Sequence, residues 1–198
     1  MQMDSTIFTS PRARRMLRPM SLRLLRWAGW RVDGCLPPEA SKCVVVGAPH
    51  TSNWDLPIGL LAAFALDLNV RWLGKCQLFR PPIGGLMRWL GGIPVDRSRS
   101  HQLVANVATD LAQWPHDLQL IVTPEGTRSK VTQWKTGFYF IAQQADLPIV
   151  LGYLDYGRKV AGLGPVLRAS GDLDADLARI KAFYAPMRGK RSELFYVG

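Results

Sequence analysis

One histidine stands where its surroundings could make it a base. His50 follows an apolar run over 44–47, and Asp55 lies five positions further on, at the start of a helical pattern. A tight loop can fold the imidazole back over the helix start, within reach of the carboxylate, and a helix N-terminus favours an ionised acid. The carboxylate would keep one imidazole nitrogen protonated and leave the other free to accept a proton, as in a general base. A histidine that only bonds to a nearby helix cap would show the same spacing.

A second cluster follows the apolar run over 118–123 and could hold an anion. It consists of Glu125, Gly126, Thr127 and Arg128. Gly126 permits an unusual backbone angle or the close approach of a ligand. Thr127 and Arg128 supply hydrogen-bond donors, and the planar guanidinium group suits phosphate oxygens. A strand-end turn with a surface arginine is the plainer interpretation of this cluster taken alone.

Two further loops place cations after expected strands. Lys75 follows the run over 70–74, and Arg97 follows the run over 93–95. One base with several phosphate-binding cations suits the activation of a hydroxyl group on an anionic substrate. The motifs of a P-loop, of a serine nucleophile elbow and of an H-E-x-x-H metal site do not occur. The three cysteines are odd in number and lack metal-type spacing, so a reducing compartment is expected, with neither a disulfide scaffold nor a metal site.

The order and spacing of these segments resemble the glycerolipid acyltransferase family, typified by bacterial 1-acylglycerol-3-phosphate acyltransferase. The resemblance covers roughly residues 42–155, and four motifs in register make it specific. The motifs are His50-x-x-x-x-Asp55, then Gly92-Ile93-Pro94-Val95-Asp96-Arg97, then Glu125-Gly126-Thr127-Arg128, and then Leu147-Pro148-Ile149-Val150; the stretch Trp134-Lys135-Thr136-Gly137 is a supporting match.

The resemblance implies a reaction and roles for these residues. His50 would deprotonate the hydroxyl of a lysolipid, most directly 1-acylglycerol-3-phosphate, while Asp55 orients the imidazole and stabilises its charge. The oxygen would then attack the thioester of acyl-CoA or acyl-carrier protein, with no metal or bound cofactor. The residues expected to bind the acceptor are Lys75, Arg97, Glu125, Gly126, Thr127 and Arg128. The alternatives are another acceptor, such as a lyso-ornithine lipid or other lysophospholipid, and a non-catalytic lipid- or nucleic-acid-binding protein.

Strand-like runs alternate with helical spacings along most of the chain. The pattern predicts an α/β fold with a mainly parallel central sheet flanked by helices, and loops at the strand ends that carry the chemistry. The expected strands cover 42–48, 70–74, 93–95, 118–123, 148–155 and 160–169, and the expected helices cover 54–67, 83–90, 101–114, 139–145 and 172–184. We expect residues 31–41 to form a connector.

The positive charge is concentrated at the N-terminus. Of the formal net charge of +10, the first 31 residues carry +6, from seven arginines and Asp4. Such a surplus predicts an anionic partner: nucleic acid, an anionic membrane surface or a phosphorylated substrate. Ser10 and Pro11 fit the start of a helix, which Pro19 should kink or divide. On this helix one side gathers apolar side chains, and most arginines lie on the other: Met16, Leu17, Met20, Leu24, Trp27 and Ala28 form the apolar side.

We therefore expect residues 1–41 to form a basic amphipathic membrane-surface arm with its connector, and residues 42–198 to form the acyltransferase domain. No apolar stretch reaches the ~18–20 residues that a bilayer span needs, and the arm lacks the apolar core of a signal peptide. These features predict a peripheral protein on the cytoplasmic face of the cell membrane. The helix could instead pack its apolar side on the domain; nucleic acid is the least expected partner.

Overall fold

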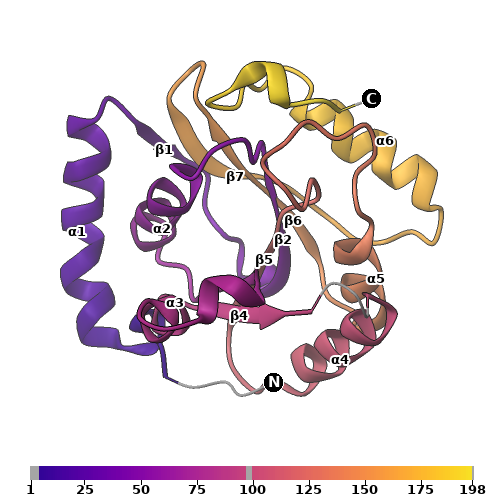
Figure 1. The fold of residues 1–198 in the computed structure, drawn as a ribbon, viewed down its shortest axis with the longest axis horizontal. Helices are drawn as coiled ribbons and strands as arrows, with labels where there is room; N and C mark the ends of the chain where they lie inside the picture. Colours follow the sequence, from indigo (N-terminus) through magenta and orange to yellow (C-terminus); the bar gives the residue numbers. More distant parts are fainter. Residues whose placement is uncertain (1–4, 97–99, 198) are drawn as a thin grey trace.

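A seven-stranded sheet forms the centre of the molecule in the computed structural model, which describes residues 5–96 and 100–197 (Figure 1). The strand order is β1-β7-β6-β2-β5-β3-β4, and every neighbouring pair is parallel except β6 and β7. The strands are β1 (Arg31–Asp33), β2 (Lys42–Ala48), β3 (Val70–Lys75), β4 (Gly92–Val95), β5 (Leu118–Val122), β6 (Ile149–Asp155) and β7 (Val160–Leu167).

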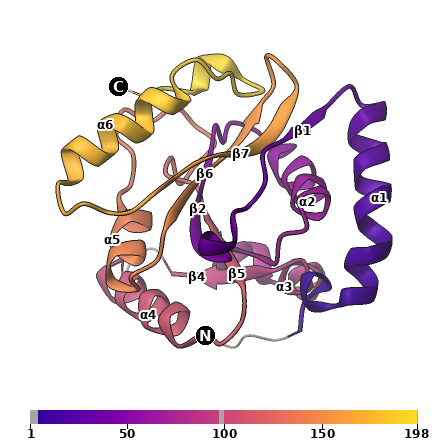
Figure 2. The ribbon, with the colours of Figure 1, turned by 180° about the vertical axis from the view of Figure 1, so that it is seen from behind.

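Helices cover both faces of the sheet, because its strands are apolar on both sides. Figures 1 and 2 show α1 and α2 on one side of the molecule and α4, α5 and α6 on the other. In β2, Val44 and Val46 belong to the core with Phe138 of α5, whereas Val45 packs in a second core with Phe64 of α2. The helices are α1 (Pro11–Trp27), α2 (Asp55–Ala65), α3 (Gly84–Trp89), α4 (Ser100–Gln113), α5 (Gly137–Gln144) and α6 (Leu173–Tyr184).

The predicted α/β fold with a mainly parallel sheet is confirmed. Each strand and helix expected between residues 42 and 184 is present, with ends within two residues of the predicted ones. The hydrophobic periodicity of a strand or a helix lies within a short stretch of sequence, so these elements could be predicted from the sequence alone.

The expected connector is only partly irregular. Arg31–Asp33 forms β1, an edge strand whose first N–H donates to the carbonyl of Lys159 at 2.9 Å, and Pro38–Ala40 forms a short 3₁₀ helix. The prediction of a plain connector was wrong, because a three-residue strand is too short to show periodicity. Its place is set by the neighbouring β7.

The N-terminal helix begins as predicted but is not divided. The Ser10 hydroxyl accepts the N–H of Ala13, and α1 continues through Pro19 to Trp27. Pro19 lies on the exposed side, where the carbonyl of Arg15 that loses its partner can bind water. None of the helices in the described residues is both long and apolar enough to cross a bilayer.

α1 packs on the domain through a side other than its expected apolar side. Leu25, which the helical pattern places among the arginines, is 2% exposed, and α1 contacts α2. Ser21 is buried on the same side. Most of the expected apolar side therefore faces away from the domain: Met16, Met20, Leu24 and Trp27 are 70%, 45%, 44% and 88% exposed.

Candidate active site

The loop between β2 and α2 carries His50 at the carboxyl edge of the sheet. β5 and β6 flank β2 in parallel, so the loops that follow all three strands meet at this edge. Glu125 follows β5 and Tyr156 follows β6. The topology thus brings together side chains that are far apart in the sequence.

His50 and Asp55 are in contact, as their spacing predicts. Nδ1 of His50 lies 3.2 Å from Oδ2 of Asp55, whose side chain is 4% exposed. The same Oδ2 accepts the N–H of Ser52 at 2.9 Å, and Oδ1 accepts the hydroxyl of Tyr156 at 2.8 Å. The carboxylate is therefore held on both oxygens and can fix the orientation of the imidazole.

These hydrogen bonds keep Asp55 ionised. Burial by itself raises the pKa of a carboxyl group, but the donors His50, Ser52 and Tyr156 outweigh it, and the pKa of Asp55 lies below its ordinary value. Burial, together with the hydrogen bond to Asp55 and its charge, raises the pKa of Tyr156 well above the ordinary value. Tyr156 thus stays a hydrogen-bond donor at neutral pH.

Glu125 holds the backbone of the loop that carries the base. Its Oε1 accepts the N–H of His50 at 2.9 Å, and the residue is 2% exposed. Burial raises the pKa of Glu125 to about 6, against the opposing effect of the His50 N–H. Its other oxygen, Oε2, is buried without a hydrogen-bond partner among the described residues. The carboxylate is thus engaged with the main chain of His50, and its charge is unsuited to bind a phosphate directly.

Gly126 adopts a backbone conformation that favours glycine. Its φ is +64°, and a Cβ atom there would lie 3.1 Å from Cδ and 3.2 Å from Cε of Lys135. The Lys135 side chain therefore covers the glycine, and the backbone N–H of Lys135 donates to the carbonyl of Pro124 at 2.8 Å. The hydroxyl of Thr127 accepts the N–H of Ser129 at 3.4 Å, which closes the turn.

The cations predicted for this edge are placed at different distances from the base. Nε of Arg128 donates to the carbonyl of Ser52 at 3.2 Å, which joins the loop after β5 to the loop that carries His50. Lys75 is exposed at the carboxyl end of β3, with β5 between its strand and β2. Arg97 lies outside the described residues.

Two residues at this site were not singled out from the sequence as site residues. Tyr156 reaches Asp55 across 101 positions, and Lys135 belongs to the supporting match after the third motif. The position of Tyr156 directly after an expected strand could have marked it as a candidate site residue. Its relevance depends on β6 lying beside β2, which the strand pattern alone does not determine.

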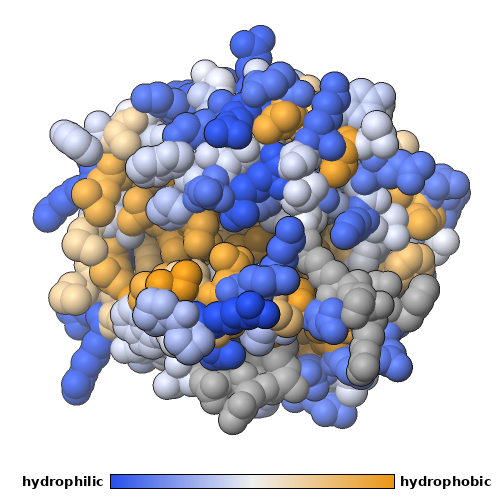
Figure 3. All heavy atoms as spheres, in the orientation of Figure 1, coloured by the Kyte–Doolittle hydropathy of each residue, from blue (hydrophilic) through white to orange (hydrophobic). Residues whose placement is uncertain are grey.

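The surface around this edge is divided by polarity. Figure 3 shows hydrophobic side chains gathered over the part of the face where Figure 1 draws α1, α2 and α3. Hydrophilic side chains dominate where Figure 1 draws the C-terminal segment after α6. An amphiphile could therefore meet both kinds of surface on this face.

Comparison with known proteins agrees with the motifs. The family model described as Acyltransferase matches residues 33–151, which is more than half of the chain. Among solved structures, the chain is similar to the 1-acyl-sn-glycerophosphate (LPA) acyltransferase PlsC from Thermotoga maritima, at 18% sequence identity and a TM-score of 0.60, over 87% of this chain and 78% of that one. No curated protein matches the chain. The fold, the His50–Asp55 pair and the family match lead to one conclusion, that the chain belongs to the Acyltransferase family.

Proposed function

We propose that the protein transfers a fatty acyl group from acyl-CoA or acyl-carrier protein to the free hydroxyl of a lysolipid. The main support for this function is the contact of His50 with Asp55, a buried residue whose two carboxylate oxygens both accept hydrogen bonds. The similar protein from Thermotoga maritima is an LPA acyltransferase by name. That likeness makes 1-acylglycerol-3-phosphate the first acceptor to test.

In the proposed reaction His50 acts as the general base. Asp55 holds the proton on Nδ1, so Nε2 accepts the hydroxyl proton as the acceptor oxygen attacks the thioester carbon. When the tetrahedral intermediate collapses, the C–S bond breaks and the imidazolium returns its proton to the leaving thiolate. A positioned base contributes roughly 10²–10⁴-fold to such a step. The proposal needs no metal and no bound cofactor.

The acceptor phosphate would lie on the β5 and β3 side of the base. Arg128 already reaches the His50 loop, and Lys135 covers Gly126 in the same turn. Lys75 at the end of β3 extends this row of cations. A phosphate held here by charge-assisted hydrogen bonds would direct the lipid hydroxyl toward His50.

The proposed site of action is an anionic membrane surface, on its cytoplasmic face. The exposed apolar stripe of α1, formed by Met16, Met20, Leu24 and Trp27, lies next to exposed arginines of the same helix. A helix with this division suits the boundary between lipid headgroups and acyl chains. Each arginine near an anionic leaflet adds about 1 kcal/mol at most. Peripheral attachment would give the enzyme access to its lipid acceptor.

The direct test is the His50→Ala variant. We expect loss of acyl transfer from radiolabelled acyl-CoA to lysophosphatidate, with an unchanged circular dichroism spectrum and melting temperature. His116→Ala is a matched control that leaves the base in place. Near-normal turnover by His50→Ala would refute the mechanism. A panel of lysolipids with the wild-type enzyme distinguishes lysophosphatidate from lyso-ornithine lipid and other acceptors.

A further inference from the structure

The segment after α6, residues 185–197, crosses the loops that form the site. In the turn after β6, the N–H of Tyr156 donates to the carbonyl of Arg188 at 2.8 Å. In the loop after β2, the hydroxyl of Thr51 accepts the N–H of Arg191 at 3.2 Å. The segment is therefore fixed to two of these loops through its main chain.

The same segment also reaches the turn after β5. Nε1 of Trp134 donates to the carbonyl of Tyr196 at 3.1 Å, and the ring centroids of Trp134 and Phe195 lie 6.4 Å apart. The contacts thus follow the order β6-β2-β5 of the strands in the sheet. We call residues 185–197 the C-terminal strap, because they lie across the loops that follow these three strands.

The positive charge of the domain is concentrated on the strap and on the turn after β5. Residues 126–135 and 185–197 hold six cations and one acid, Glu193, whereas the rest of residues 32–198 holds twelve cations and thirteen acids. The neighbouring carboxylates of Asp55 and Glu125 are buried. The six cations, which we call the basic rim, are Arg128, Lys130, Lys135, Arg188, Lys190 and Arg191.

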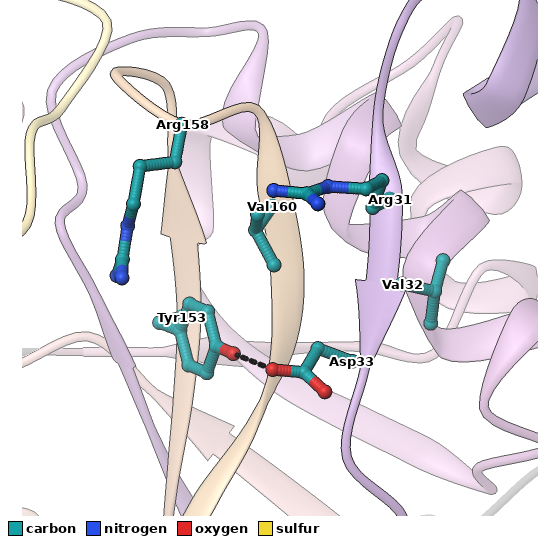
Figure 4. A pocket seen from close by; sticks show the side chains of 6 residues that line it. All are labelled: Arg31, Val32, Asp33, Tyr153, Arg158 and Val160. Carbon is teal, nitrogen blue, oxygen red and sulfur yellow. Dashed lines mark hydrogen bonds between the residues drawn. The ribbon is translucent and has the colours of Figure 1, made fainter.

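The basic rim is accessible, and its charge is not neutralised. Five of its residues are exposed and Arg128 is half-buried, and none of the six forms an ion pair with a described residue. The cavity between β1, β6 and β7 differs (Figure 4): Asp155 pairs with its Arg158, and Asp33 offsets its Arg31. An anionic partner is therefore expected at the rim and not in that cavity.

Exposed aromatic rings lie among these cations. Nζ of Lys190 lies 4.6 Å from the ring centroid of Trp54, and Nζ of Lys130 lies 5.8 Å from that of Tyr196. The two aromatic residues are 59% and 44% exposed. Tryptophan, tyrosine and arginine are enriched where proteins bind one another. A single acceptor phosphate engages only a few of the donors in the rim, so the remaining charge suits a larger acidic partner.

The strap lies away from the helix that we propose to lie on the membrane. Figures 1 and 2 show it continuing from α6, on the side of the molecule away from α1. Hydrophilic side chains dominate this part of the surface in Figure 3. A partner in the aqueous phase could therefore reach the strap while α1 stays on the membrane.

We propose that the basic rim is the docking surface for an acidic acyl-carrier protein, which is the acyl donor. Its phosphopantetheine then presents the thioester to His50 from the loops beneath the strap. Attack by the acceptor oxygen breaks the C–S bond, the hydroxyl proton passes through His50 to the sulfur, and the carrier protein leaves as a free thiol. The inference rests on the proposed acyl transfer and names the donor of that reaction.

The first test compares two donors, palmitoyl-carrier protein and palmitoyl-CoA. Lys190→Glu and Lys130→Glu each reverse one exposed charge of the rim. We expect each to raise the KM for the carrier-protein donor at least fivefold, because complementary charge speeds the encounter of two proteins. The KM for palmitoyl-CoA should rise at least threefold less, since CoA has no protein surface. An equal rise with both donors would assign the rim to phosphate groups and overturn the inference.

Arg168→Glu is the matched control. It reverses the charge of an exposed arginine that follows β7 at the opposite edge of the sheet. Both KM values should change less than twofold. If this variant raised the KM for the carrier-protein donor as much as Lys190→Glu does, net charge would act without a docking surface, and the inference would be wrong.

Binding of the holo-carrier protein without an acyl chain separates this inference from the proposed function. In titration calorimetry the Kd should rise at least fivefold for Lys190→Glu. Binding that depends on Lys190, in a protein that acylates no lysolipid, would refute the proposed function and leave the docking surface standing. Acyl transfer from palmitoyl-CoA without any binding of the carrier protein would do the reverse. Weaker binding of Lys190→Glu to anionic vesicles, with its carrier-protein binding unchanged, would place lipid headgroups on the rim and also overturn the inference.

Discussion

At the scale of single residues, Tyr156 is the clearest addition to the catalytic pair. Its hydroxyl binds Oδ1 of Asp55 at 2.8 Å, and its ring meets Trp30 edge-on with centroids 4.9 Å apart. Tyr156→Phe keeps the ring contact and removes one donor from the carboxylate. A hydrogen bond to a charged group contributes about 1.5–3 kcal/mol, so kcat should fall roughly tenfold or more. Steady-state kinetics with Tyr196→Phe as the exposed control would check this; an unchanged kcat would show that Asp55 does not need the hydroxyl.

Glu125 should make stability depend on pH. Its pKa is about 6 in the folded protein, against an ordinary value of 4.5, so the native state holds this proton more tightly than the unfolded state. Between about pH 4.5 and pH 6 the native state binds more protons, and stability falls as pH rises through that window. The loss amounts to about 2 kcal/mol of unfolding free energy.

The Glu125→Gln variant isolates this effect. The amide oxygen can still accept the His50 N–H, but the side chain no longer titrates. Urea denaturation at pH 4.5 and pH 6.5 should show the variant gaining about 2 kcal/mol relative to the wild type at the higher pH. A constant difference between the two proteins would mean that folding does not shift the pKa of Glu125.

The site illustrates which contacts a sequence can predict. His50 and Asp55 are five positions apart, so loop geometry alone brings them together, and the spacing predicted their contact. Tyr156 and Glu125 reach the same loop across 101 and 75 positions. Their placement depends on β5 and β6 flanking β2, and the order of strands in a sheet is a property of the whole fold.

At the scale of elements, the helices and strands were largely predictable, whereas the side on which α1 packs and the edge strand β1 were not. The cap of α1 predicted where the helix begins, whereas Pro19 was expected to kink or divide it, and the helix has two sides with apolar residues that could face the interior. The structure buries Leu25 and leaves Trp27 exposed, since α1 packs with Ala62 and Ala65 of α2, whose small side chains allow close approach. The edge strand β1 has too few residues for a pattern of its own.

The exposed apolar stripe of α1 predicts that a substitution within it weakens binding to membranes without changing the stability of the protein. Trp27 is 88% exposed, so Trp27→Ser should leave the melting temperature unchanged. Because tryptophan favours the headgroup boundary, the variant should partition about tenfold less into anionic vesicles. Vesicle sedimentation measures this, with Phe140→Ser as control: Phe140 is 38% exposed on α5, on the other side of the sheet. Equal partition of wild type and Trp27→Ser would mean that the stripe does not face the lipid.

At the scale of the whole molecule, the N-terminal segment is joined to the catalytic centre through packing. Trp30 is 6% exposed in a core with Leu25 of α1 and Ala161 of β7, and its ring supports Tyr156. The segment thus combines an outer face suited to a membrane with an inner face that stabilises the hydrogen-bonded partner of Asp55. Its deletion should affect stability and chemistry as well as membrane attachment.

Removal of residues 1–31 tests this coupling. The truncated protein loses the burial of Leu25 and Trp30, each worth about 2–5 kcal/mol, so its melting temperature should fall by about 10 °C or more. Its kcat toward detergent-dispersed lysophosphatidate should fall as well, because Tyr156 loses the ring that positions it. Trp27→Ser, measured in the same assay, should keep both values and lose only vesicle binding. A truncated protein with wild-type melting temperature and kcat would show instead that the segment is a separate membrane arm.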